Sequence, residues 1–164
     1  MAFGTERQGY APRKGFVAVG QPRIESMIMV GAGQAEVGEF MSFNTARDGV
    51  NKLSAANLIY NASAGTGNGA GIIVRDPDNP GGNDLFEAGE VVPILIMGQV
   101  YILAAEAVTA GAVVTVDADN GRNYHDDNSG IFVPGHRWRT AVASGQLGLV
   151  DVSFAAYASR GQNS

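Results

Sequence analysis

The sequence predicts an all-β protein, and three observations lead to that prediction. Glycine accounts for 23 of the 164 residues, about twice its usual share of roughly 7%. Short runs rich in valine, isoleucine, leucine and aromatic residues alternate with clusters of glycine and polar residues, which is typical of strands and turns. Helical periodicity is weak throughout. We therefore expect a single antiparallel β-sandwich or barrel, jelly-roll-like or similar, with an extended N-terminal arm.

Three segments are expected along the chain. Residues 1–20 are predicted to be the extended arm, because glycines, a proline and scattered charges interrupt any sustained period. Such a stretch buries too little apolar surface to offset its ordering entropy. Residues 21–157 are expected to form the β-domain, and the polar residues 158–164 a flexible tail.

Seven strands are predicted in the β-domain from their apolar, β-branched and aromatic content: residues 58–60, 71–75, 91–97, 100–105, 112–117, 136–142 and 147–154. Residues 25–30 fit a helix or a strand, and we favour a strand. Residues 46–57 are compatible with one or two helical turns, although Gly49 and Asn51 weaken that interpretation. Hairpin turns are predicted at residues 98–99, where glycine comes first, and at residues 143–146.

A short pattern recurs at residues 37–42, 88–93 and 110–115: a small or apolar residue, a glycine, one spacer and two apolar residues. The glycine can take a positive φ in a tight turn that leads into a strand. The first and third copies continue alike to an Asp-Gly or Asn-Gly pair, a hairpin signal. The copies are either turns that β proteins commonly reuse or equivalent strand–turn units of one barrel or sandwich.

Composition excludes several classes of function. Without cysteine, the chain forms no disulfide, thiolate zinc site or iron–sulfur cluster. A net charge of −5 offers no basic stripe for nucleic acid. The longest uncharged apolar stretch, residues 91–105, is too short to span a membrane as a helix, and the N-terminus lacks a signal-peptide pattern. We expect a soluble protein made in a cytoplasm, without nucleic-acid or membrane partners.

No cofactor is expected from the two glycine-rich loops. Residues 31–36 resemble a dinucleotide-binding turn, but Glu36 stands where a third small residue is needed and would repel a pyrophosphate. Residues 65–71 lead into a predicted strand and not into a helix N-terminus, so they make no anion site. Flexible surface loops account for both stretches.

No metal site is predicted, although acidic loops supply candidates. Five residues match positions 1, 3, 6, 9 and 12 of a calcium-binding loop: Asp76, Asp78, Gly81, Asp84 and Glu87. Position 5 is Pro80, which has no side-chain oxygen, and the preceding residues are not helical. An acidic surface turn explains the same loop. A second acidic loop, at residues 117–127, has no defined ligand spacing.

The protein is not expected to be an enzyme. Neither His125 nor His136 has a nearby serine elbow, and no His-Glu-x-x-His motif is present. Strand alternation places His136 and Trp138 on one face, and Arg137 and Arg139 on the other. These arginines suit bidentate contacts with the carboxylates of a partner or of the same chain. Trp138, the only tryptophan, is expected in the core or at a subunit contact.

The arm is expected to lie over a neighbouring subunit or a partner protein. It carries Phe3, Tyr10, Phe16 and Val17 within a polar, glycine-rich sequence. Apolar side chains spaced along an extended arm can enter separate pockets, while glycines let the backbone follow the partner's surface. Arg13 contributes to a small positive patch that suits an acidic neighbour.

Five motifs follow one another in the later part of the chain: Ala88-Gly89-Glu90, Gly98-Gln99-Val100-Tyr101, Ala110-Gly111-Ala112-Val113-Val114, Gly135-His136-Arg137-Trp138 and Ser144-Gly145-Gln146-Leu147. Their order resembles that of the cement, or decoration, proteins of tailed-bacteriophage capsids. The resemblance holds from Gly71 onward and is loose before it. Ala112 departs from the family pattern, which usually has an acid there, and the long turn after Arg75 is a second departure.

The resemblance implies a non-catalytic all-β protein that is made in the host cytoplasm and binds the outer surface of a phage capsid. Its partners would be the major capsid protein and copies of itself, with a trimer favoured over a dimer. The residues expected at interfaces are Phe3, Tyr10, Arg13, Phe16, Val17, Arg137, Trp138 and Arg139. A charged fraction of only 16% fits a surface largely covered by neighbours. The alternatives are a small β-sandwich module that binds carbohydrate or a receptor, and another virion component such as a tail or fibre protein.

Overall fold

The computed structural model describes residues 13–18, 22–44, 48–53, 60–61, 66–67, 69–75, 84–117, 121–126 and 131–153. These residues form strands and no helix, which confirms the all-β prediction. The strands are β1 (Arg23–Ile28), β2 (Ala35–Glu36), β3 (Phe40–Phe43), β4 (Val50–Lys52), β5 (Tyr60–Asn61), β6 (Thr66–Gly67), β7 (Gly69–Ile73), β8 (Leu85–Phe86), β9 (Val91–Leu103), β10 (Val113–Val116), β11 (Tyr124–His125), β12 (Ile131–Trp138) and β13 (Leu147–Ser153).

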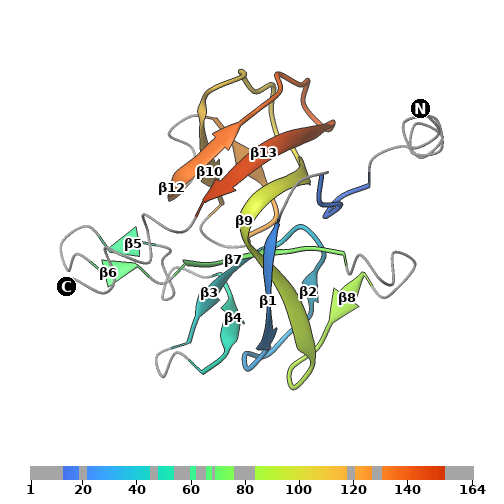
Figure 1. Ribbon diagram of the computed structural model, residues 1–164, viewed down its shortest axis with the longest axis vertical. Coiled ribbons are helices and arrows are strands. Elements are labelled where there is room, and N and C mark those ends of the chain that lie inside the picture. The colour runs from blue at the N-terminus through green and yellow to red at the C-terminus, as the bar shows by residue number, and fades with distance from the viewer. Residues whose placement is uncertain are drawn as a thin grey trace.

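Nine of these strands form one antiparallel sheet, which curls on itself (Figure 1). Its order is β11-β10-β12-β13-β9-β7-β3-β4, and β1 pairs with β9 outside this path. β2 pairs with β8, and β5 with β6, as separate two-stranded sheets. Figure 1 shows β1, β3, β4 and β7 on one side of the molecule, β10, β12 and β13 on the other, and β9 running through both. We call residues 23–97 the first half and residues 98–153 the second half.

β9 is a single strand of 13 residues, so the predicted hairpin at residues 98–99 is wrong. Its first part pairs with β1 and β7, and its last part pairs with β13. Gly98 has a φ of +136°, which bends the strand where it changes partners without ending it. A Cβ on Gly98 would lie 3.2 Å from the Cα of Pro22, so glycine also allows this close approach.

The two halves repeat one arrangement of strands. In the first half β1 pairs with β9, β9 with β7, β7 with β3 and β3 with β4. In the second half the end of β9 takes the place of β1, and β13, β12, β10 and β11 follow in the same order. Two isolated parallel bridges, Met29–Val50 and Ala104–Tyr124, occupy equivalent positions. The chain is therefore an internal structural duplication whose halves share β9.

Glycine turns build this repeat. In each turn the N–H of the fourth residue donates to the carbonyl of the first, and the third residue is a glycine with a φ between +78° and +90°, as in a type II turn. The N–H of the glycine donates to the carbonyl of a facing residue, at 2.7–2.8 Å. The N–H of that facing residue donates in turn to the carbonyl of the fourth turn residue, at 2.9–3.0 Å. The glycines are Gly15, Gly38, Gly89, Gly111 and Gly145. The recurring sequence pattern thus marks equivalent strand–turn units.

A carboxylate completes the three turns that carry the recurring pattern. In the first two, Oε2 of Glu39 or Glu90 accepts a hydrogen bond from the N–H of the first turn residue, at 2.9 and 2.5 Å. The third turn has Ala112 at that position, and Oδ2 of Asp126 accepts from the N–H of Thr109 at 2.6 Å instead. Although Ala112 stands where the family usually has an acidic residue, the N–H of Thr109 still has an acceptor, because Asp126 supplies the carboxylate.

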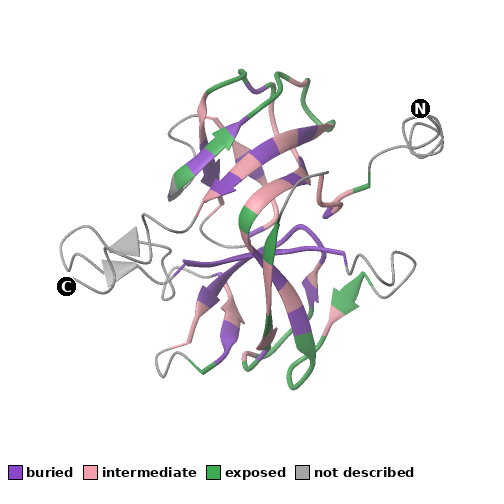
Figure 2. Ribbon diagram, viewed as in Figure 1, coloured by how far each residue is buried: buried purple, intermediate pink, exposed green. Residues whose placement is uncertain are grey.

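Buried side chains form two clusters, and Figure 2 shows buried residues alternating along β9 and β13. The smaller cluster fills the first half, with members Met29, Ala35, Val37, Met41, Val50, Ala70, Ile73, Val92 and Ile94. The larger cluster extends from the junction of the halves into the second half and includes Phe40, Ile72, Leu95, Ile102, Val114, Tyr124, Trp138 and Val150. Each curled half therefore encloses its own apolar interior.

At two neighbouring core positions, the second half has one larger and one smaller residue than the first half. By strand register, Trp138 is equivalent to Ile73 and Gly148 to Val92. Trp138 is 1% exposed, and a Cβ on Gly148 would lie 2.6 Å from its Cζ3 atom. The indole ring thus takes the space that a side chain at position 148 would need.

Four further predicted strands are present with shifted ends, whereas residues 58–59 of the strand predicted at 58–60 lie outside the described residues and Tyr60 belongs to β5. β1, β7, β10 and β13 correspond to the predicted strands at 25–30, 71–75, 112–117 and 147–154. The strand predicted at 136–142 begins earlier and ends at Trp138, and Val142 bridges Val108 instead. The helical turns at 46–57 are wrong for the described part, because Val50–Lys52 pairs with β3 as a strand. The predicted turn at 143–146 is confirmed.

We predict that Trp138→Ala lowers the free energy of unfolding by about 3–5 kcal/mol, because it empties a large buried volume. Denaturant unfolding measures the loss. Trp138→Ile with Gly148→Val recreates the combination found in the first half and should lose less stability than Trp138→Ile alone. A loss below about 1 kcal/mol for Trp138→Ala would contradict the core role of the ring.

Candidate functional site

A cluster of five charged side chains joins the two halves, and we call it the seam cluster: Lys14, Glu36, Glu39, Lys52 and Arg122. Glu39 is fully buried; its Oε2 accepts from Nε of Arg122 at 3.2 Å, and its Oε1 lies 3.4 Å from Nζ of Lys52. Glu36 pairs with Lys14 at 2.8 Å. A buried carboxylate is tolerated only when it is paired, so the cluster ties the loop before β11 to the first half.

Tyr124 makes a second connection between the halves. Its hydroxyl donates to the carbonyl of Gly38 at 2.6 Å, and the whole side chain is buried. Burial raises the pKa of Tyr124 well above its ordinary value, and the charges of Glu39 and Glu36 raise it further. The phenol therefore stays protonated and continues to donate this hydrogen bond at neutral pH.

The described part of the predicted arm lies on the protein's own β9. Val17 forms an antiparallel bridge with Val100, and the turn at Gly15 binds Tyr101 through two backbone hydrogen bonds. Phe16 and Val17 are partly buried there, whereas Arg13 is exposed. Residues 13–18 thus extend the sheet in cis. Phe3 and Tyr10 lie outside the described residues.

Arg75 fastens this segment to the first half. Its guanidinium lies 5.8 Å from the ring centroid of Phe16, and its Nε donates to the carbonyl of Lys14 at 3.1 Å. The same guanidinium pairs with Asp84 and holds the pKa of that carboxyl below its ordinary value. Asp84 is one of the calcium candidates, so a cation there would have to compete with Arg75.

The other acidic candidates are placed as follows. Glu87 accepts a hydrogen bond from Nε2 of Gln34 at 2.9 Å, and Asp76 and Asp78 lie outside the described residues. Within the described part of the chain, no three His, Asp or Glu side chains gather as metal ligands would.

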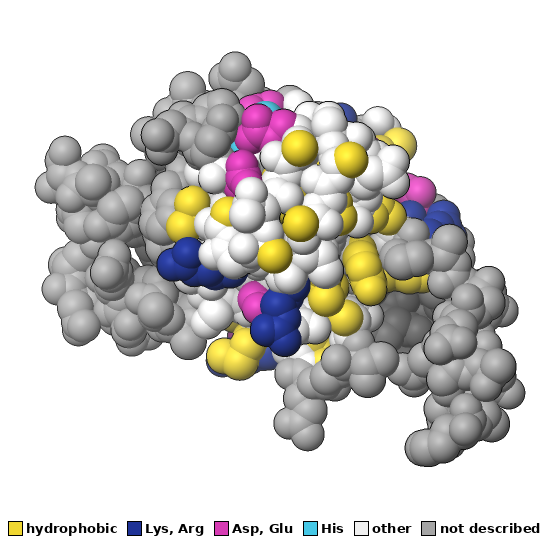
Figure 3. All heavy atoms as spheres, turned by 90° about the horizontal axis from the view of Figure 1, so that it is seen from above, with side chains coloured by type: hydrophobic (Ala, Val, Ile, Leu, Met, Phe, Trp, Pro, Cys, Tyr) yellow, Lys and Arg dark blue, Asp and Glu magenta, His cyan; other side chains and the backbone are white. Residues whose placement is uncertain are grey.

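The two histidines occupy different environments. His125 lies between Asp117, with Nε2 to Oδ1 at 3.0 Å, and Glu106, with Nδ1 to Oε1 at 3.4 Å. Figure 3 shows acidic side chains gathered beside a histidine on this end of the molecule. His136 is buried and packs edge-on against the ring of Phe40, with the ring centroids 6.2 Å apart.

The strand that carries His136 and Trp138 alternates as predicted. His136 and Trp138 point inward, whereas Arg137 and Arg139 are exposed. Nε1 of Trp138 donates to the carbonyl of His125 at 2.9 Å, so Trp138 belongs to the core of its own chain. Nη1 of Arg137 donates to the carbonyl of Gly111 at 3.1 Å, and Nη1 of Arg139 lies 3.5 Å from Asp151.

Among the residues that the structure describes, aromatic side chains do not line an exposed groove such as a carbohydrate-binding module needs. Of the aromatic residues available for such a groove, Tyr124 and Trp138 are buried, and Tyr101 is partly buried and pairs through its backbone with Gly15 and Phe16. The side chain of Phe132 and all of Tyr157 lie outside what the structure describes. No helix within the described residues could cross a membrane.

The described clusters of charged side chains hold segments of this chain together. Comparison with known proteins gives the class of protein. A family model described as structural cement protein (E217 gp24/Pam3 gp6) matches residues 15–153. Because the match covers most of the chain, the protein belongs to this phage family and is a structural component associated with the capsid.

Solved structures add to this comparison. The chain is similar to one in a structure entitled "The capsid of Myoviridae Phage XM1", with a TM-score of 0.63 and 17% identity over 86% of this chain and 89% of that chain. It also resembles the head fiber gp8.5 N base of bacteriophage phi29, with a TM-score of 0.47 and 10% identity over 80% and 95%. The first similarity supports the fold. No curated protein matches the chain.

We predict that Glu39→Gln lowers the free energy of unfolding by about 3 kcal/mol, because it leaves Arg122 and Lys52 facing a neutral amide. Thermal and denaturant unfolding measure the change. The control is Glu90→Gln, which alters the equivalent but exposed turn and should lose less than about 1 kcal/mol. Equal losses for the two variants would show that burial of Glu39 does not matter.

Proposed function

We propose that this protein stabilises a phage capsid by binding the major capsid protein on the outer surface of the shell. The observation that carries the proposal is the extent of the family match, which spans residues 15–153 and so includes both halves and the segment on β9. Agreement over the whole architecture supports a common role more strongly than agreement over one turn motif.

The physical character of the fold supports this role. The halves share β9 and are joined by the seam cluster and Tyr124, so the protein presents a connected body that loses little conformational freedom on binding. A capsid repeats each contact many times. Modest affinity per copy therefore gives strong stabilisation through many simultaneous contacts.

The proposal includes no catalytic reaction. It places the protein on the outside of the virion after synthesis in the host cytoplasm, and it includes assembly with copies of itself, with a trimer favoured over a dimer by the family motifs. In this proposal the exposed Arg137 and Arg139 contact acidic groups of a partner.

We predict that the protein binds shells of its own phage that lack it. Purified protein should co-sediment with these shells to a fixed number of copies and raise the temperature at which they release DNA or dissociate. Calorimetry of the decorated and undecorated shells measures the shift. A protein that neither co-sediments nor changes the melting temperature would contradict the proposal.

The undescribed part of the arm is proposed to contact a neighbour. Phe3 and Tyr10 are apolar anchors in a segment that precedes the cis contact of Phe16 and Val17, and Arg13 stands exposed at the start of that contact. Apolar anchors on an extended segment gain affinity when a partner supplies pockets for them.

We predict that deleting residues 2–12 leaves the β-domain folded and weakens attachment to shells about tenfold or more, equivalent to at least about 1.4 kcal/mol. Residues 13–18 are retained because their hydrogen bonds complete the sheet. Circular dichroism checks the fold, and co-sedimentation checks attachment. Deletion of residues 158–164 is the control. If the 2–12 deletion decorates shells as tightly as the full chain, the arm makes no contact there.

A further inference from the structure

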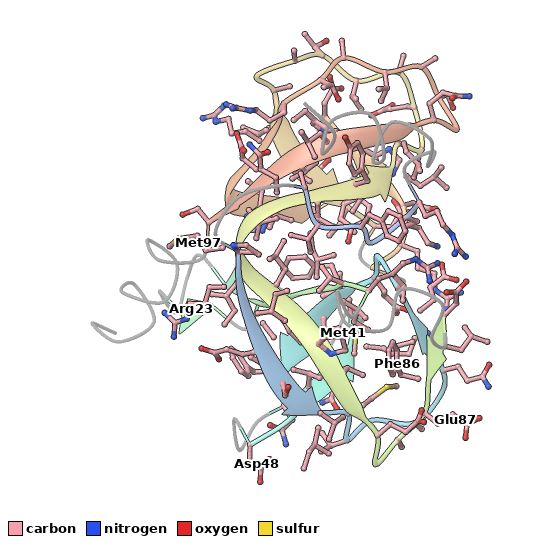
Figure 4. All side chains as sticks on the ribbon, turned by 45° about the vertical axis from the view of Figure 1, so that its right-hand side comes forward. Arg23, Met41, Asp48, Phe86, Glu87 and Met97 are labelled. Atoms are coloured by element: carbon pink, nitrogen blue, oxygen red, sulfur yellow. The ribbon has the colours of Figure 1, made fainter. Side chains whose placement is uncertain are left out.

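β1 leaves one of its edges unpaired within the described chain. The strand bonds to β9 along one side, and no other described strand pairs with Arg23–Ile28. Figure 4 shows Arg23 and Met97 near each other at one end of β1. An unpaired strand edge presents a row of backbone donors and acceptors and can accept a further strand.

The equivalent edge in the second half is covered. There the end of β9 takes the place of β1, and residues 15–18 lie along it. The carbonyl of Tyr101 accepts from Gly15 at 2.7 Å, its N–H donates to Phe16 at 3.0 Å, and the carbonyl of Gln99 accepts from Ala18 at 2.9 Å. One half of the duplication thus shows what an occupied edge looks like: a short antiparallel strand.

Register identifies the groups that this edge of β1 offers. In the duplication, Tyr101 is equivalent to Ser26 and Gln99 is equivalent to Ile24. The register shows this, because Tyr101 lies opposite Leu149 on β13 and Ser26 lies opposite the equivalent residue, Pro93, on β9. Pro93 has no N–H, and its carbonyl accepts from Val74 on β7 at 3.0 Å. The N–H and C=O of Ser26 therefore point away from β9. Because backbone groups alternate along a strand, those of Ile24 point the same way.

The charges on this edge are self-complementary. Arg23 and Glu25 lie on one face, with Nη2 to Oε1 at 2.7 Å, and their side chains are 66% and 41% exposed. If two β1 strands run antiparallel with Ile24 opposite itself, Arg23 of each copy lies opposite Glu25 of the other. These are non-hydrogen-bonded positions, where opposed side chains approach most closely and opposite charges attract. The exposed Met97 beside Arg23 would be partly covered as well.

We propose that two copies of this protein pair through these edges, antiparallel about a two-fold axis at Ile24, so that their sheets become continuous. The proposal rests on the self-association included in the proposed function. It departs from the expected trimer, because a two-fold strand pairing closes at two copies. Arg23 and Glu25 fix the register, and the outward N–H and C=O of Ile24 supply the reciprocal hydrogen bonds; Ser26 lies opposite Pro22 of the other copy, which accepts through its carbonyl but has no N–H to donate.

Charge reversal tests the register. Sedimentation equilibrium of the full chain should show a dimer at micromolar concentration. Arg23→Glu and Glu25→Arg each place like charges opposite one another across the axis and should raise the dimer dissociation constant about tenfold or more, equivalent to about 1.4 kcal/mol. The double variant restores opposite charges in both copies and should return the constant to within about threefold of the original. A monomeric full chain, unaffected single variants or an unrestored double variant would overturn the pairing.

Cross-linking tests the position of the axis. The chain has no cysteine, so Ile24→Cys introduces a unique thiol that meets its own copy across the axis. A short bismaleimide should convert this variant to a covalent dimer on a denaturing gel, whereas Ser144→Cys, on an exposed turn of the second half, should form no covalent dimer. Circular dichroism confirms that each variant folds. If Ile24→Cys loses its fold, the charge variants decide, because both charges are exposed.

Shell binding is measured on the same variants, which separates this proposal from the function. Single reversals that dissociate the dimer yet still bind shells support the pairing and leave the function intact. Dimers that bind no shell support the pairing and contradict the function. A chain that is monomeric in solution and protects the amides of Ile24 and Ser26 from exchange only on shells would show that a capsid segment occupies the edge, and would overturn the proposal.

Discussion

The structure depends on one strand that serves two interiors. β9 supplies the central pairing partner of the first half and the first strand of the second, and Gly98 lets it turn between them without a break. The halves therefore share backbone hydrogen bonds and do not merely touch across side chains. Any displacement of one half strains the ladder of the other, which suits a structural component of a capsid.

Polar contacts reinforce that shared strand at the junction of the halves. Glu39 is at once the carboxylate that completes a glycine turn and the buried anion that Arg122 and Lys52 surround. Tyr124 reaches the carbonyl of the same turn from the second half. One turn thus receives both connections. In the second half the equivalent carboxylate comes from Asp126, so its turn keeps the hydrogen bond without a buried charge.

The two duplicated halves differ at one strand edge. Residues 13–18 cover the edge of the second half, whereas the matching edge on β1 has no described partner. The pairing proposed above gives this asymmetry a use, since a protein that pairs through one strand edge must still remain folded by itself. A covered edge protects the isolated chain from indiscriminate pairing, and an open edge is available for assembly.

The sequence by itself determined the local features. Gly38, Gly89 and Gly111 were recognisable as turns, because a positive φ is inexpensive only for glycine, and His136 and Trp138 were placed on one face because side chains alternate along a strand. Tertiary structure alone decided what depends on distant partners. A positive-φ glycine between apolar runs fits a hairpin or a bend equally well, and only the pairing with β1, β7 and β13 made Gly98 a bend. The cis placement of Phe16 and the burial of Glu39 likewise depend on residues far along the chain, which no local pattern encodes.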